Sequence, residues 1–362
     1  MGVEVLEQII RVAGTLNRYY EEMRSKAISY LKPAMMSRRD ERSPYIRKVD
    51  EIESEIVVSI DVGYRHKELL GQRMLLFTVT AIITTMKDEK PLNKPDIKIV
   101  PKAPGLPSDV IASLMSAAQH FEHTRQYMFK LPKNFDGIFI VDGPLLPHSR
   151  LLVKGTTVIK KYREKLQKNL VGMVYESIKK KIPLVFIIKP ERSEASYLLR
   201  FFKLQKLFKD ENDVDMLLWV LEEGNYTSPV RLWPDSEIQL YPPVEKFMQS
   251  VEEMYVRSYG SSFPAIYHSY LKVKDIAKPM AIQFLSCEAE WDKVLNYQHD
   301  VLSKIYSSCI CGSLPFELML ADSQSRVTRE IFKEALKYLA DFIDDPYLRV
   351  EILELLRGEY RG

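Results

Sequence analysis

Two strongly apolar segments of the sequence each end in an aspartate. In "EIVVSIDVG" five strand-favouring residues precede Asp61, and in "DGIFIVDG" an apolar run precedes Asp142. Runs of this length, rich in β-branched residues and bounded by glycine, are typical of buried strands. A carboxylate at the end of such a strand is a turn former, a salt-bridge partner or a metal ligand, and the rest of the chain has to distinguish these roles.

The order of the elements predicts the fold class, an α/β protein with a mixed sheet flanked by helices. Three strands are expected first and are followed by alternating helices and strands, a pattern that favours a sheet of mixed direction. Further strands and helices are expected after residue 226, beginning with a short hairpin. The expected elements before that point are strands at 56–60, 73–86 and 96–100, a helix at 108–130 capped by Ser108, a strand at 137–142, a helix around 158–181, a strand at 182–189 and helices at 193–223.

We expect the chain to consist of three parts. Residues 1–50 contain an amphipathic helix, with apolar side chains at helical spacing over 1–33, and a polar linker, and we expect this part to contact a partner. Residues 51–335 form the predicted core. Residues 336–362 form a helical extension at the C-terminus. Packing of both terminal helices on the protein's own core is the alternative interpretation.

Composition excludes several classes of protein. A net charge of +3 gives no overall nucleic-acid signal, so a basic surface has to come from local clustering. Three cysteines are an odd number and favour a reducing, cytoplasmic setting. No window approaches the roughly 20 apolar residues of a membrane span. The sequence also lacks the GxSxG and P-loop motifs, which argues against a serine hydrolase and against an ATP-driven motor.

The paired aspartates favour a divalent metal. If their strands are parallel neighbours, Asp61 and Asp142 project from the same carboxyl edge of the sheet, where α/β proteins place ligands. Two carboxylates in close proximity repel each other unless a cation lies between them. Ligation by oxygen alone suits Mg²⁺ or Mn²⁺. Turn formation by each aspartate separately is the alternative.

A third carboxylate is predicted on the helix at 108–130. Ile111, Met115 and Ala118 form a ridge at helical spacing, and the next position on this ridge is Glu122. A carboxylate at the end of an apolar ridge needs a partner, because burying it alone is costly. Either the metal site or a surface network with its charged neighbours supplies that partner.

The order of these motifs resembles the NurA family of archaeal DNA-end-processing nucleases, which have a ribonuclease-H-like core. The matching segments are "VVSIDVG", "LMSAAQHFEHTRQY", "IFIVDGPLL", "VFIIKPERSE", "AIYHSYLKV", "PMAIQFL" and "GSLPFELMLADSQSRVTRE". The resemblance implies that Asp61, Asp142 and the helix acid ligate Mn²⁺ or Mg²⁺. It also implies that Lys189 neutralises phosphate charge, and that Asp322, which takes the place of a family histidine, joins Asp61, Asp142 and Glu122 in holding the cations. An ungapped alignment places the helix acid on Gln119 instead of Glu122.

The resemblance also implies a function. It indicates a deoxyribonuclease, a 5′–3′ exonuclease or a single-strand endonuclease, that hydrolyses phosphodiester bonds with two cations about 3.5–4 Å apart. Its expected substrates are single-stranded DNA and duplex ends, in end resection and repair. The expected partners are a second copy of the chain and a hexameric HerA-type ATPase.

Two features bear on how the chain acts on DNA. The lysine-rich segments 154–168 and 179–181 are either support for DNA or solvated surface. Gln119 and Asp322 keep an alternative function open, an adaptor that binds DNA ends or the translocase without cutting.

Overall fold

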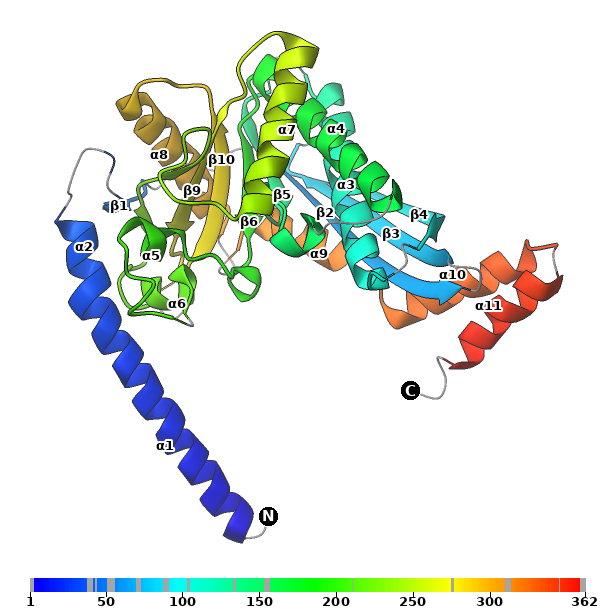
Figure 1. The fold of residues 1–362 in the computed structure, drawn as a ribbon, viewed down its shortest axis with the longest axis horizontal. Coiled ribbons are helices and arrows are strands. Elements are labelled where there is room, and N and C mark those ends of the chain that lie inside the picture. The colour runs from blue at the N-terminus through cyan, green and yellow to red at the C-terminus, as the bar shows by residue number, and fades with distance from the viewer. Residues whose placement is uncertain are drawn as a thin grey trace.

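One large sheet of mixed direction organises the protein (Figure 1). The computed structural model describes residues 3–37, 42, 44–50, 56–69, 73–86, 91–102, 105–132, 135–152, 157–209, 211–274, 277–309, 314–344 and 346–358. Among these residues the sheet has ten strands, in the order β1-β7-β9-β10-β6-β5-β2-β3-β4, with β8 paired to β9. The expected fold class, a mixed sheet flanked by helices, is confirmed.

The strands combine parallel and antiparallel pairing. β4, β3 and β2 form an antiparallel meander, β2, β5 and β6 run parallel, and β10 and β9 continue antiparallel. This order of β4-β3-β2-β5-β6 places the parallel strands at the centre of the sheet, where both faces are covered. The strands are β1 (Ile46–Lys48), β2 (Ile56–Leu69), β3 (Arg73–Thr84), β4 (Leu92–Pro101), β5 (Gly137–Asp142), β6 (Leu184–Ile188), β7 (Asn225–Thr227), β8 (Val230–Trp233), β9 (Ala265–Leu271) and β10 (Met280–Ser286).

Helices cover both faces of the sheet. The largest apolar core lies between the sheet and α3, α4 and α7, and smaller cores lie under α8 and α9 and under α10 and α11 on the opposite face. The helices are α1 (Val3–Lys26), α2 (Lys32–Met36), α3 (Ser108–Lys130), α4 (Thr157–Lys180), α5 (Tyr197–Phe201), α6 (Asp213–Leu217), α7 (Pro242–Tyr259), α8 (Trp291–Ser307), α9 (Phe316–Ser325), α10 (Arg329–Asp341) and α11 (Pro346–Gly358).

The strand that carries Asp61 does not end there, so that prediction was wrong. β2 continues to Leu69 because β3 pairs with it from Val58 onward and keeps its backbone hydrogen-bonded. What ends near Asp61 is the pairing with β5, whose last pair is Ile60 with Val141. β2 therefore extends beyond its parallel neighbour, and Asp61 lies at the point where the parallel ladder stops.

Three smaller expectations have mixed outcomes. The helix predicted at 108–130 is confirmed as α3, but Ser108 is its first residue and not its cap, and the Ser108 hydroxyl donates to Glu68. The strand expected at 96–100 is confirmed as part of the edge strand β4. The short hairpin was wrong, because β7 pairs with β1 and β9 whereas β8 pairs with β9 alone.

The first helix projects from the body of the protein (Figure 1). Its C-terminal part is attached: Met23 is buried in the main core, Tyr19 donates a hydrogen bond to Glu211, and Arg24 lies over the ring of Trp219. The division at residues 50 and 335 stays a prediction. None of the helices in the described part of the chain has the length and apolar character needed to cross a bilayer.

Candidate metal centre

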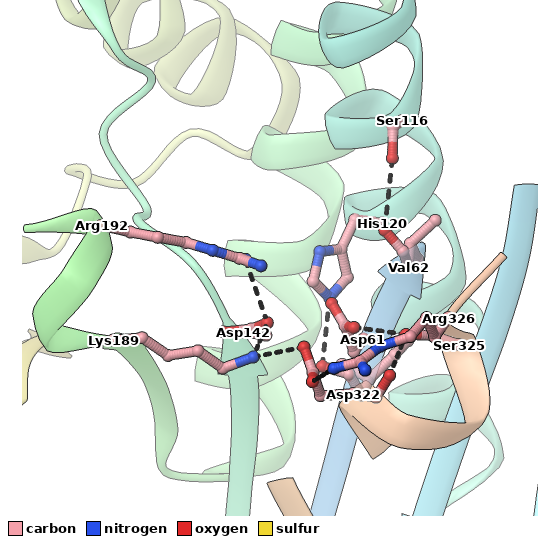
Figure 2. A network of polar contacts seen from close by, with 11 residues as sticks. Asp61, Val62, Ser116, His120, Asp142, Lys189, Arg192, Asp322, Ser325 and Arg326 are labelled. Carbon is pink, nitrogen blue, oxygen red and sulfur yellow. Dashed lines mark hydrogen bonds and ion pairs between the residues drawn. The ribbon is translucent and has the colours of Figure 1, made fainter. Parts of the chain in front are cut away.

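Three carboxylates meet at the end of the parallel strands (Figure 2). Asp61 follows the last residue of β2 that pairs with β5, and Asp142 is the final residue of β5. Asp322 comes from α9, far along the chain. One carboxylate oxygen from each of these three residues lies within 4.8 Å of those of the other two.

A glycine allows α9 to approach the site. A Cβ atom at Gly63 would lie 2.1 Å from the backbone oxygen of Ser325, so no other residue fits there without moving α9 or β2. This close approach places the Ser325 hydroxyl against Asp61, to which it donates a hydrogen bond. Gly63 therefore sets the position of Asp322, which lies one helical turn before Ser325.

Three cationic side chains balance the acids. The Lys189 ammonium lies 2.9 Å from Asp142 Oδ2 and 2.5 Å from Asp322 Oδ1, and so bridges two of the three carboxylates. Lys189 follows β6, the parallel neighbour of β5, which explains why its side chain reaches Asp142. Arg192 lies 3.5 Å from Asp142 Oδ2, and Arg326 lies 3.4 Å from Asp322 Oδ2.

The surroundings shift the pKa values of Asp142 and Asp322 in opposite directions. Burial, reinforced by the charge of Asp61, raises the pKa of Asp142 to about 7 despite Lys189 and Arg192. Burial also acts to raise the pKa of Asp322, but Lys189 and two arginines outweigh it and leave that pKa below its ordinary value. Burial lowers the pKa of Lys189, whereas its two carboxylate partners raise it, and the net direction is upward.

The helix α3 contributes no carboxylate to this group, which corrects the expectation for Glu122. Glu122 is half-buried and pairs with Lys165 of α4 at 3.1 Å, because the register of α3 turns it toward α4. Gln119 is buried but donates to Thr78 on β3. His120 lies nearest to the site, with Nε2 3.3 Å from the backbone oxygen of Ile60.

The buried position of His120 beside Asp61 sets the pKa of its side chain. The pKa of its imidazole is lowered by burial, and the charge of Asp61 opposes that shift only in part. A neutral imidazole therefore occupies the helix side of the centre, where the sequence favoured an acid.

The donor set fits a hard divalent cation. Asp142 Oδ1 is buried and accepts no hydrogen bond from any described residue, although it carries part of the charge of the carboxylate. A buried anionic oxygen without a partner is costly, and a metal ion satisfies it directly. Asp61, Asp142 and Asp322 offer oxygen only, the ligand type that Mg²⁺ and Mn²⁺ prefer.

Several residues of this site were not identified from the sequence alone. Arg192 and Ser325 lie within the matching segments without a predicted role, and His120 was expected only as a neighbour of Glu122 in a surface network. One signal was available for two of them: Ser325 follows Asp322 by three residues on a short helix, and Arg192 follows Lys189 by three. Neither spacing shows that α9 packs on β2.

The fold and the centre together define a class. An antiparallel meander joined to parallel strands, with carboxylates at the end of the parallel ladder, is a ribonuclease-H-like α/β architecture with a candidate metal centre. The model of the NurA domain family matches residues 21–315. The chain belongs to the NurA family.

Solved structures agree with this assignment at the level of the fold. The NurA nuclease from Sulfolobus solfataricus is similar at a TM-score of 0.58 and 12% identity, over 94% of this chain and 97% of that chain. A structure of NurA bound to dAMP and manganese is similar at a TM-score of 0.52 and 11% identity, over 95% and 99% of the two chains. A search of curated protein sequences finds no match.

Proposed function

We propose that this protein is a nuclease that hydrolyses DNA phosphodiester bonds with Mn²⁺ or Mg²⁺. The observation that carries this proposal is the convergence of Asp61, Asp142 and Asp322 beside a buried lysine. Family membership supports it, as do the similar folds of a NurA nuclease and of a NurA bound to dAMP and manganese. In this proposal the three aspartates hold the cation.

The chain's own residues have separate tasks in the reaction. When bound, the cation supplies an activated water and Lewis-acid stabilisation of the phosphate. Lys189 and Arg192 present positive charge where the non-bridging phosphate oxygens gather negative charge. Lys189 also holds Asp142 and Asp322 in place, and Ser325 orients Asp61 through its hydrogen bond. The carboxylates act as ligands and no covalent intermediate forms.

A basic groove supports the strand away from the centre. A cavity of about 660 Å³ lies between α4 and α7 and is lined by Lys160, Lys168 and Lys246. Clustered lysines attract phosphates regardless of base sequence, so in this proposal a strand that leaves the metal centre follows this groove, which Glu164 also lines. This groove gives the lysine-rich segment 154–168 its proposed role.

The test is metal-dependent cleavage. Purified wild-type protein is incubated with single-stranded and duplex DNA and Mn²⁺, and Asp61→Asn and Asp142→Asn are measured in parallel. Removing one ligand is expected to slow cleavage at least about 100-fold. Asp341→Asn, on the exposed side of α10, is the matched control and is expected to cut like the wild type. Equal cleavage by all four proteins would show that another site or a contaminant is responsible.

A non-catalytic adaptor is the second candidate. It is favoured by the bridge that Lys189 makes between Asp142 and Asp322, and by His120 where the sequence favoured an acid. The adaptor binds DNA ends or a translocase but does not cut. DNA binding without cleavage, whether or not a HerA-type ATPase is added, selects this candidate over the nuclease.

We also propose that α1 binds a partner, in a homodimer that docks on a hexameric HerA-type ATPase during cytoplasmic DNA end resection. Six apolar side chains on α1 are 47–63% exposed, an unusual extent for a helix attached at one end: Val5, Leu6, Ile9, Ile10, Val12 and Leu16. Light scattering of the wild type and of Ile9→Asp/Leu16→Asp tests the dimer. A monomeric wild type would reject it, and co-purification with the ATPase tests the docking separately.

A further inference from the structure

A second cavity adjoins the metal centre. It has a volume of about 270 Å³ and lies between the loop that follows Asp142 and the loop that follows Lys189. Arg192 belongs to both places, because it lines the cavity and pairs with Asp142. A substrate whose phosphate lies at the carboxylates therefore has its next group within reach of this cavity.

The wall of the cavity includes two buried polar side chains that can address a ligand, Ser193 and Gln283. Ser193 lines it and is 4% exposed, and its hydroxyl makes no hydrogen bond with any described residue. Gln283 also lines it and is 1% exposed. Its Oε1 accepts from the backbone N–H groups of Leu145 and Leu146, so the amide orientation is fixed and Nε2 is left to donate.

A buried histidine lies behind these groups. His268 pairs with Gln283 across β9 and β10 and so faces the same side of the sheet. Its ring packs edge-on against the ring of Tyr197, which lines the cavity. The two ring centroids are 4.7 Å apart and the ring planes are at 79° to each other. Neither nitrogen of His268 has a hydrogen-bond partner among the described residues. His268 does not itself line the cavity, so the unpaired hydroxyl of Ser193 is the group that indicates a polar ligand there, because buried polar groups are nearly always paired.

The exposed ring of Tyr241 forms a flat platform at the rim of the cavity. The guanidinium of Arg200 lies 4.5 Å from the ring centroid of Tyr241, and its Nη1 donates to the backbone oxygen of Gln239 at 3.0 Å. Tyr241 is 57% exposed although it lines the cavity. An exposed ring held by a stacked arginine is the kind of surface on which nucleobases stack.

We propose that this cavity binds one nucleobase of the DNA strand whose phosphate lies at the metal centre. The inference rests on the proposed function. A base is flat, carries uncharged donors and acceptors at its edge, and has a face that stacks on tyrosine, and the cavity offers a counterpart to each property. Its volume lies just below the range of about 300–1,000 Å³ that accommodates drug-sized ligands, which fits a single ring system. Arg192 is left to contact the attached phosphate.

Equilibrium binding tests the cavity without any cleavage. The full-length protein is titrated by calorimetry with 2′-deoxyadenosine 5′-monophosphate and, separately, with 2-deoxyribose 5-phosphate, which lacks the base. We expect the wild type to bind the nucleotide at least about tenfold more tightly, as stacking of one base predicts. Equal affinity for the two probes would overturn the proposal.

Two substitutions locate the effect. Ala195→Phe fills the cavity, and Tyr241→Ala removes the exposed ring at its rim. Each substitution is expected to bring the affinity for the nucleotide close to that for the sugar phosphate, without changing binding of the sugar phosphate itself. Tyr347→Ala, at an 86% exposed tyrosine on α11, is the matched control and keeps the wild-type ratio. Thermal unfolding checks that each variant is folded. A folded Ala195→Phe protein that retains the wild-type ratio would place the base elsewhere.

Cleavage separates this inference from the proposed function. Oligonucleotides with and without one abasic residue are cut with Mn²⁺, and the position and rate of each cut are measured. We expect slower cutting next to the abasic residue in the wild type but not in Tyr241→Ala. If no DNA is cut while the binding ratio persists, the nuclease proposal fails and the base site stands. If DNA is cut at equal rates at every position, the base site fails alone.

Discussion

The ammonium of Lys189 lies 2.9 Å from the carboxylate of Asp142, and both side chains are buried, at 5% and 1% exposure. Removing one partner of a buried ion pair strongly destabilises the folded protein, because the other charge is left without compensation. Lys189 also pairs with Asp322, so one side chain joins the end of β6 to α9. The candidate metal centre is therefore also a structural junction.

Lys189→Met is expected to lower the free energy of unfolding of the metal-free protein by about 3–5 kcal/mol. Lys278→Met is the control, because Lys278 forms a more exposed pair with Asp215 and its loss is expected to cost about 1 kcal/mol or less. Urea unfolding measures both. Saturating Mn²⁺ is expected to restore part of the stability of Lys189→Met, since a ligand that binds only the folded state stabilises it. A loss no larger than that of the control would contradict the junction.

Gly63→Ala is expected to displace α9 and weaken metal binding. The new Cβ would meet the backbone oxygen of Ser325 at 2.1 Å, and backbone atoms do not yield as a flexible side chain does. Overpacking of this kind costs about 1–3 kcal/mol. Gly14→Ala on α1, where nothing lies within 4 Å, is the control and is expected to be neutral or stabilising. Thermal unfolding and a Mn²⁺ titration measure the two effects, and an unchanged Mn²⁺ affinity in Gly63→Ala would argue against a role for α9.

Glu122→Gln is expected to leave Mn²⁺ affinity and cleavage within about twofold of the wild type, since loss of a partly exposed pair costs little. Its partner Lys165 lies on α4, and both side chains are partly exposed. Asp322→Asn, by contrast, is expected to lower Mn²⁺ affinity at least about tenfold, because it removes a charged ligand oxygen. Calorimetry with Mn²⁺ compares the two variants. A larger effect at Glu122 than at Asp322 would reverse the assignment made from the structure.

His268→Phe is expected to make the protein less sensitive to acid. Burial lowers the pKa of His268 from 6.5 to about 3 in the folded protein, so between these values the unfolded chain binds the additional proton. The contribution of neutral His268 is complete above about pH 6.5 and is lost as the pH falls toward 3. At about pH 5 this loss amounts to about 2 kcal/mol in the wild type and is absent in the variant.

Urea unfolding at about pH 5 and pH 7.5 measures this difference. Ring size is similar in the two side chains, and the comparison between the two pH values cancels the change in packing. Equal pH dependence of the wild type and His268→Phe would mean that His268 has a partner that keeps its pKa near the ordinary value.

Periodicity and strand composition were sufficient for most of the architecture. α3 is the clearest case, because the predicted range of 108–130 coincides with the observed helix. The apolar run before Asp142 likewise predicted β5 and its last residue. These elements were predictable because local sequence sets both their type and their ends, through apolar spacing in α3 and a change from apolar to turn residues after β5.

The end of β2 was not predictable in the same way. Its sequence becomes polar after Asp61, and polar residues that follow an apolar strand segment normally indicate a turn. β3 nevertheless pairs with it up to Leu69, and tertiary pairing outweighs the local preference.

The sequence by itself determined that Asp61 and Asp142 follow the buried parts of two strands. Parallel pairing of β2 and β5 then placed them side by side. The family resemblance implied both Glu122 and Asp322 as further ligands, and only the tertiary structure decided between them. Asp322 reaches the site because α9 packs on β2 at Gly63, whereas Glu122 faces α4 because of the register of α3. Strand composition is a local property, but the approach of a distant helix depends on packing between segments far apart in the chain, which spacing along the sequence does not encode.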